Sequence, residues 1–235
     1  MLRNLRTAKA FIFDFYGTLI ENDVSVPPMW RYLGDLGYKS NAELETMFEP
    51  NAFDGCRTPT GVAHDDWLND SWRAFLRLSG VPQHEIESTL ASLLWRRETF
   101  DVHCADGVLE LLKLLRERQI RIGVCSNWEG PIAPYLGAAG LLDLDAVVTS
   151  RDCGARKPHR AMFARTCEQL AVDPCDAVFI GDSWEADIVG ALRAGLLPIW
   201  VRHRRRSRAL DQLVVEVDSI TELVTHLRDL HAAAS

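Results

Sequence analysis

The chain has 235 residues, of which 47% are hydrophobic and 25% are charged, and its formal net charge is -7. This length suits one sizeable core with an inserted subdomain, and the negative charge argues against a nucleic-acid partner. Since no apolar run reaches the roughly eighteen residues of a membrane span, we expect no membrane partner either.

The cysteines predict a reducing environment. None of the six forms a CxxC motif, and no secretory signal precedes the first apolar run, so we expect free thiols in a cytoplasmic protein. Cys125 lies in an apolar run and is expected to pack in the core rather than to act as a nucleophile. The basic stretch at residues 202–208 is expected to be a solvated loop, with a phosphate-bearing partner as the alternative.

The first predicted element is a strand at residues 10–13 that ends at a carboxylate, Asp14. Four apolar, β-prone residues are typical of a buried parallel strand. Ligands bind at the carboxyl ends of such strands, where an aspartate can be a nucleophile or a metal ligand. An aspartate that merely caps the next helix would give the same local pattern.

Residues 21–100 carry helical spacing. Apolar residues recur at helical intervals at 30–36 and 44–48, a stronger stripe runs from Trp67 to Leu76 before Gly80, and a further helix is expected at 82–100. We therefore predict that residues 21–100 form a helical subdomain inserted after the first strand.

From Gly107 the chain alternates between helices and strands. Helices are expected at 108–115, 131–139, 159–170, 186–194 and after 219, and strands at 120–125, 146–149, 177–180, 198–201 and 213–215. Strands separated by helices imply parallel pairing with right-handed crossovers. The predicted fold class is α/β, a doubly wound parallel sheet formed by residues 1–20 and 101–235.

Polar residues stand at the ends of the first four core strands: Asp14, Ser126, the segment 149–157 that ends in Lys157, and Asp182. The carboxyl ends of parallel strands meet at one edge of a sheet, so we expect these groups to gather in one crevice.

Asp14 and Asp182, with Asp187, would form an acidic cluster that requires a cation, and oxygen ligands favour Mg²⁺. Lys157 would hold a phosphate oxygen or Asp14 itself.

The remaining groups suit an anionic substrate. Ser126 and Asn127 could bind a phosphate oxygen, and the turn at Gly17 and Thr18 presents backbone N–H groups to an anion. A carboxylate nucleophile together with Mg²⁺, lysine and serine indicates phosphoryl transfer through an aspartyl-phosphate, with a small phosphorylated substrate.

Four motifs carry a resemblance to a known family. They are Asp14-Phe15-Tyr16-Gly17-Thr18-Leu19, Val124-Cys125-Ser126-Asn127, Gly154-Ala155-Arg156-Lys157-Pro158 and Gly181-Asp182-Ser183-Trp184-Glu185-Ala186-Asp187. With this order and spacing, the chain resembles the haloacid dehalogenase (HAD) superfamily of hydrolases, subfamily I, over about residues 10 to 225. The resemblance implies a HAD-like core with a helical cap, and Mg²⁺ held by Asp14, the Tyr16 carbonyl and Asp182, with Asp187 in support.

Tyr16 departs from the phosphatase pattern. Phosphatases that resemble this chain have an aspartate at that position, which protonates the leaving oxygen; general acid catalysis contributes about 10² to 10⁴ in rate. A phenol with a pKa of about 10 is a poor donor. In having a tyrosine at this position, the first motif resembles that of the L-2-haloacid dehalogenases. Those enzymes expel halide, which needs no proton, and they use no metal. Against that resemblance, this chain keeps Asp182 and has Phe163 where those enzymes have a tyrosine.

Two further side chains are candidates for substrate contact. His64 in the predicted cap, near Arg57, could face the substrate and donate the missing proton, whereas an exposed loop is the simpler interpretation. Trp184 is expected to line the crevice or to pack under the cap.

The prediction is therefore a Mg²⁺-dependent HAD-like phosphatase, monomeric or homodimeric. The alternatives are a metal-independent 2-haloacid dehalogenase and a catalytically weakened protein that binds a phosphorylated ligand.

Overall fold

The computed structural model describes residues 2–21, 33–38, 55–58, 62–98, 102–128, 130–203 and 214–232. The chain divides into two compact units, residues 1–22 with 102–235, and residues 23–101. The helix expected at 44–48, most of the basic stretch at 202–208 and the last three residues lie outside the described residues.

The first unit contains a six-stranded sheet in which every pairing is parallel, with the order β3-β2-β1-β4-β5-β6. Its strands are β1 (Ala10–Phe13), β2 (Arg121–Ser126), β3 (Ala146–Thr149), β4 (Ala177–Gly181), β5 (Leu197–Val201) and β6 (Val215–Val217). β1 is central, and all four of its residues are buried. A continuous apolar run without alternation suits a strand covered on both faces.

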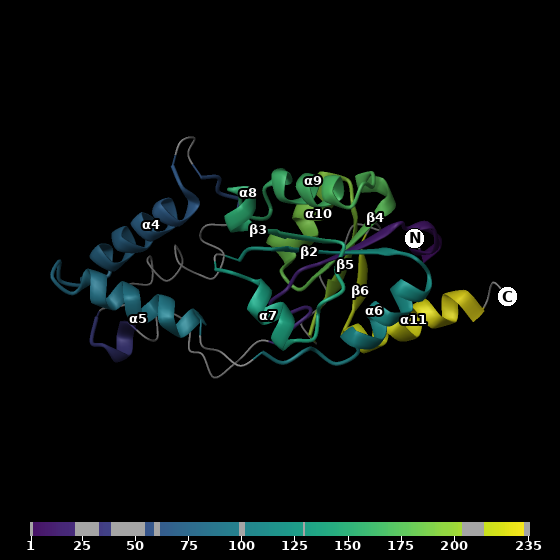
Figure 1. Ribbon diagram of the computed structural model, residues 1–235, viewed down its shortest axis with the longest axis horizontal. Coiled ribbons are helices and arrows are strands. Elements are labelled where there is room, and N and C mark those ends of the chain that lie inside the picture. Colours follow the sequence, from purple (N-terminus) through teal and green to yellow (C-terminus); the bar gives the residue numbers. More distant parts are fainter. Residues whose placement is uncertain are drawn as a thin grey trace. The chain divides into compact units, whose positions relative to one another are not determined.

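Helices cover both faces of this sheet (Figure 1). α9 (Arg160–Gln169) and α10 (Gly190–Ala194) pack together on one face, and α6 (Val108–Glu117) and α11 (Ile220–Ala232) pack together on the other. The unit also contains the helices α1 (Leu2–Thr7), α7 (Ala133–Ala138) and α8 (Ser150–Cys153) and the 3₁₀ turn Pro174–Asp176. The doubly wound α/β fold predicted from the sequence is confirmed.

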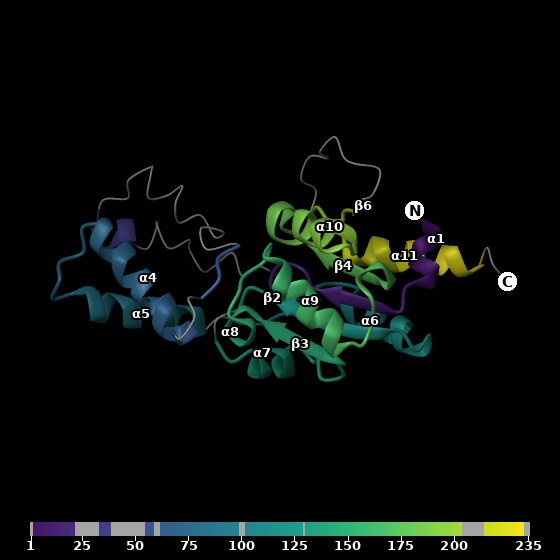
Figure 2. The same ribbon diagram turned by 90° about the horizontal axis from the view of Figure 1, so that it is seen from above.

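The second unit is helical in its described part. α4 (His64–Leu78) and α5 (Ile86–Glu98) lie alongside each other (Figure 2). Trp72, Phe75 and Leu76 of α4 form an apolar core with Ile86 and Leu90 of α5. The helix predicted from residue 82 begins only at Ile86, because residues 83–85 form a turn in which Glu85 N–H donates to the Pro82 carbonyl.

Two further sequence predictions are corrected, and two short helices are added. The last strand is 215–217 rather than 213–215, because Val215 and Val217 are the inward residues that pair with β5. The helix expected at 186–194 is a π-helix, Trp184–Val189, followed by α10. α1 and α8 were not predicted, since they are too short to show a helical repeat.

No helix in the described part of the chain is long and apolar enough to cross a membrane. None of the six cysteines is in a disulfide bond, as predicted.

Candidate active site

The carboxyl edge of the sheet brings the polar strand ends together. Asp14 directly follows β1, and its backbone N–H donates to the Ile180 carbonyl at 2.8 Å, which continues the ladder between β1 and β4. Ser126 is the last residue of β2, and Asp182 follows β4. This is the convergence that the sequence predicts, and it results from the parallel register of three adjacent strands.

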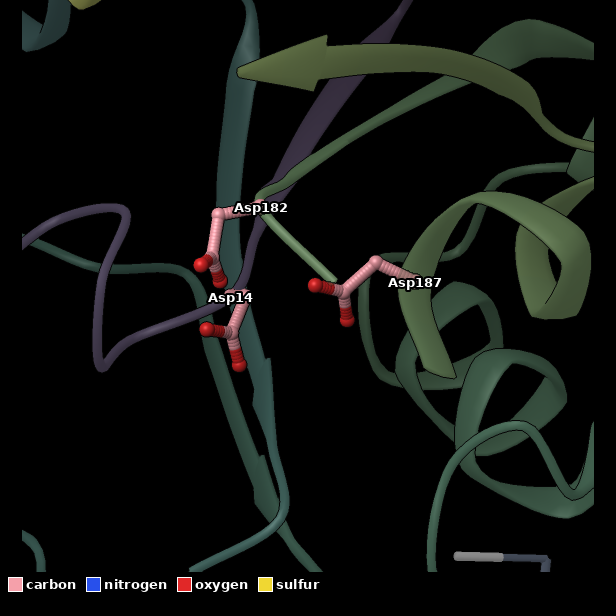
Figure 3. A group of neighbouring side chains, drawn as sticks. All are labelled: Asp14, Asp182 and Asp187. Carbon is pink, nitrogen blue, oxygen red and sulfur yellow. The ribbon is translucent and has the colours of Figure 1, made fainter. Parts of the chain in front are cut away.

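Three carboxylates form a cluster at this edge. Asp14, Asp182 and Asp187 each place a carboxylate oxygen within 4.8 Å of the others, and the side chains point toward a common space (Figure 3). Asp14 and Asp187 are buried, and Asp182 is partly exposed. Such a cluster is unfavourable unless cations or protons balance its charge.

Lys157 supplies part of that balance. Its ammonium Nζ lies 2.6 Å from Asp14 Oδ1 and 2.6 Å from Asp187 Oδ1, and 5.3 Å from the centre of the Phe179 ring. Burial by itself would lower the pKa of Lys157, but the two carboxylates outweigh it and raise that pKa above its ordinary value. Three carboxylates and one ammonium leave an excess of two negative charges when all are ionised.

Asp187 is held from several sides. Burial raises the pKa of its carboxyl to about 6, and the Asp14 charge adds to that effect, while Lys157 and the Ser183 N–H oppose it. The Ser183 N–H donates to Asp187 Oδ2 at 3.0 Å. A Cβ at Gly181 would lie 2.3 Å from the same oxygen, so only glycine fits at the end of β4.

The two oxygens of Asp14 have different surroundings. Oδ1 accepts hydrogen bonds from Ser126 Oγ at 3.1 Å and from Lys157 Nζ at 2.6 Å. Within the described ranges, Oδ2 has no hydrogen-bond donor. A carboxylate fixed through one oxygen presents the other to a ligand, which is the arrangement that a nucleophile requires.

Asn127 contacts the backbone of Lys157. The Lys157 N–H donates to Asn127 Oδ1 at 2.7 Å, and Asn127 Nδ2 donates to the Lys157 carbonyl at 3.1 Å. Sequence reasoning expects this amide to bind substrate, whereas these contacts anchor the loop that carries Lys157. The spacing of two distant motifs gave no signal for this pairing.

The turn after β1 carries three of the predicted residues. Gly17 has a φ of +87°, a backbone conformation that favours glycine. Its N–H donates to the Ile20 carbonyl at 2.9 Å. Thr18 is fully buried, and its Oγ1 has no hydrogen-bond partner among the described residues. The Tyr16 side chain is 38% exposed.

The remaining substrate-binding candidates lie elsewhere. Trp184 begins the π-helix and packs edge-to-face on Trp200, with ring centroids 5.0 Å apart. His64 is the first residue of α4 in the helical unit, and its side chain lies outside the described residues. Arg57 is in that unit too.

The donor set suits a magnesium ion. The clustered ligand atoms are carboxylate oxygens, with neither sulfur nor imidazole among them. Their combined negative charge is larger than the single positive charge of the Lys157 ammonium that contacts them. Hard cations such as Mg²⁺ prefer these ligands.

The fold and the site define a doubly wound parallel α/β core with a carboxylate cluster at the ends of its central strands. The family model of haloacid dehalogenase-like hydrolases matches residues 8–195, and the chain belongs to this family. As the resemblance in the sequence implies, the protein is a hydrolase.

Individual relatives have low sequence identity to this chain. The chain is 28% identical over 198 residues to a ribulose-1,5-bisphosphate 5-phosphatase of Halopiger xanaduensis, which covers 80% of this chain and 82% of the relative. It is 28% identical over 139 residues to haloacid dehalogenase-like hydrolase domain-containing protein 3 of Mus musculus; this match covers 58% of the chain and spans only 55% of the mouse protein. A 2-haloacid dehalogenase of Pseudomonas syringae has the same fold, with a TM-score of 0.63, 21% identity, and coverage of 94% of this chain and 99% of that structure.

Proposed function

We propose that the protein is a Mg²⁺-dependent phosphatase that acts on a small phosphorylated metabolite through an aspartyl-phosphate at Asp14. The observation that carries the proposal is the cluster of Asp14, Asp182 and Asp187, whose excess negative charge calls for a cation beyond Lys157. The relative from Halopiger, named as a phosphatase, agrees with it.

The metal would be held by the carboxylates of Asp14 and Asp182 and by the Tyr16 carbonyl, with Asp187 in support. When bound, Mg²⁺ would neutralise charge on the phosphoryl oxygens and orient them. Residues 21–100 would be the cap of this enzyme, and we assign them that role from the family resemblance alone.

Asp14 Oδ2 is the nucleophile in this proposal. It attacks phosphorus, the bond from phosphorus to the ester oxygen breaks, and that oxygen leaves with the electron pair and takes up a proton. Lys157 and Ser126 orient the Asp14 carboxylate through their hydrogen bonds to Oδ1. Water then attacks phosphorus in the aspartyl-phosphate, which releases inorganic phosphate and restores the carboxylate.

The leaving-group proton limits the substrate range. Tyr16 stands where related phosphatases have an acidic donor, and a phenol gives up its proton reluctantly. We expect acyl and aryl phosphates to react faster than alkyl phosphates, because their leaving oxygens need little protonation.

Dehalogenation is the second candidate, and the tyrosine at position 16 favours it. In that reaction Asp14 would displace halide from carbon, and water would then attack the carboxyl carbon of the resulting aspartyl ester. The two reactions therefore place the oxygen from water differently.

Turnover in ¹⁸O-labelled water separates them. Hydrolysis of acetyl phosphate or p-nitrophenyl phosphate should put ¹⁸O into inorganic phosphate and leave the Asp14 peptide unlabelled in mass spectra. Halide release from 2-chloropropionate, with ¹⁸O in the Asp14 carboxyl group, would contradict the phosphatase proposal.

A further inference from the structure

Two side chains at the end of β5 bond to the turns that carry the candidate metal ligands. Trp200 Nε1 donates to the Asp182 carbonyl at 3.0 Å, and His203 Nε2 lies 2.7 Å from the Gly17 carbonyl. A carbonyl only accepts hydrogen bonds, so Nε2 of His203 carries the proton and donates it. Both donors lie outside the four family motifs.

Trp200 fixes the turn after β4 from two directions. It is 2% exposed and pairs with Gly181 in the β4–β5 register, directly before Asp182. Its ring also packs edge-to-face on Trp184, at an interplanar angle of 64°. The Trp200 indole therefore holds both the backbone of Asp182 and the side chain of Trp184. These two contacts restrict the direction in which the Asp182 carboxylate points.

His203 holds the turn after β1. Its φ of +48° lies in the left-handed region, which is uncommon for a residue other than glycine and costs free energy. In this conformation the imidazole reaches Gly17, the residue that separates Tyr16 from Thr18. The hydrogen bond from His203 therefore restrains the backbone next to the Tyr16 carbonyl.

We propose that Trp200 and His203 are positioning residues that orient the Asp182 carboxylate and the Tyr16 carbonyl, and that they thereby set the affinity for Mg²⁺. The inference rests on the proposed function, because it assumes that Asp182 and Tyr16 bind the metal. Preorganised ligands bind more tightly, since little conformational freedom is lost on binding. Neither side chain contacts substrate in this proposal.

The test measures Mg²⁺ binding to metal-free enzyme by calorimetry, together with the Mg²⁺ concentration that half-activates p-nitrophenyl phosphate hydrolysis. Trp200→Phe keeps a ring but lacks the N–H, and His203→Ala removes the second donor. Each should weaken Mg²⁺ binding about fivefold, the effect of one net hydrogen bond. The double variant should weaken it about 25-fold if the two turns are independent.

Two further variants separate positioning from general damage. His203→Gln retains an N–H donor and should recover most of the lost affinity. Trp72→Phe makes the same aromatic exchange in the core of the helical unit and should leave the Mg²⁺ constants unchanged. Excess Mg²⁺ should restore most of kcat in Trp200→Phe and His203→Ala, which purely structural damage would not allow.

Mg²⁺ constants within twofold of wild type in both single variants and in the double variant would overturn the positioning role. So would a loss of kcat that excess Mg²⁺ does not restore. If Trp200→Phe does not fold, the comparison of His203→Ala with His203→Gln still tests the proposal, because His203 is exposed. If the wild-type enzyme neither binds Mg²⁺ nor hydrolyses p-nitrophenyl phosphate, the proposed function is overturned as well. If the wild-type enzyme does both, only the positioning role is at stake.

Discussion

At the scale of single residues, Lys157 explains how three acidic side chains coexist at one edge of the sheet. It is 2% exposed and contacts two of them, and such a buried ion pair is costly to break because the remaining charges have no water to stabilise them. Asn127 in turn holds the backbone of Lys157. The carboxylate of Asp14, the ammonium of Lys157 and the amide of Asn127 therefore form one connected set.

The role of Asn127 can be separated from substrate binding. Asn127→Ala removes two hydrogen bonds, so the free energy of unfolding should fall by about 2 kcal/mol in urea titrations. Turnover should fall through kcat, because Lys157 is less well placed. A raised KM with unchanged kcat and stability would instead support the role in substrate binding that the sequence suggests.

Thiol reactivity tests the burial of the strand that carries Ser126. Burial raises the pKa of Cys125 to about 12 and that of Cys167 to about 11, so neither forms a reactive thiolate near neutral pH. With Ellman's reagent at about pH 8 we expect both to react only after unfolding, whereas the exposed Cys175 reacts at once. Cys175→Ser should reduce the fast phase, and labelling of Cys125 in the native protein would contradict this core.

At the scale of secondary-structure elements, α10 owes its close approach to α9 to one glycine. A Cβ on Gly190 would lie 2.6 Å from Phe163 Cζ and 3.0 Å from Pro158 Cβ. Gly190→Ala should therefore lower the free energy of unfolding by about 1 to 3 kcal/mol, the usual cost of overpacking. The urea transition followed by circular dichroism measures it.

The matched control is Gly34→Ala, because no atom of the described residues lies within 4 Å of a Cβ at that position. It should leave the transition close to that of wild type. Equal stability of the Gly190→Ala variant and wild type would show that the two helices are not in tight contact.

The elements that the sequence predicts well are those with a strong local pattern. β1 and β4 are continuous apolar runs, and α4 has a clear apolar stripe, so their type follows from local residues. The π-helix at 184–189 does not, because its wider turn depends on Ser183, whose carbonyl accepts from the N–H groups of Asp187 and Ile188. π-Helical turns of this kind are frequent at functional sites.

At the scale of the whole molecule, topology explains why the site could be located from the sequence. Parallel strands placed side by side carry Asp14, Ser126 and Asp182 to one edge, so a prediction of parallel strands and of their ends suffices to bring these residues together. Contacts between segments distant in sequence could not be predicted in this way. The bond from Trp200 to Asp182 and that from His203 to Gly17 join such segments, and no motif marks either donor.

The measurement that tests the proposed function most directly is hydrolysis of p-nitrophenyl phosphate by the purified protein, with Mg²⁺ and then with EDTA. The aryl leaving group needs little protonation, so the assay examines the nucleophile and the metal apart from Tyr16. Asp14→Asn preserves the size of the side chain and removes the nucleophile, and Tyr16→Asp supplies the acid.

The proposal predicts turnover that requires Mg²⁺, stops with EDTA and is absent in Asp14→Asn. Tyr16→Asp should extend activity to alkyl phosphates. Turnover that persists in EDTA or in Asp14→Asn would contradict the proposed function. The absence of turnover in both wild type and Tyr16→Asp would contradict it too.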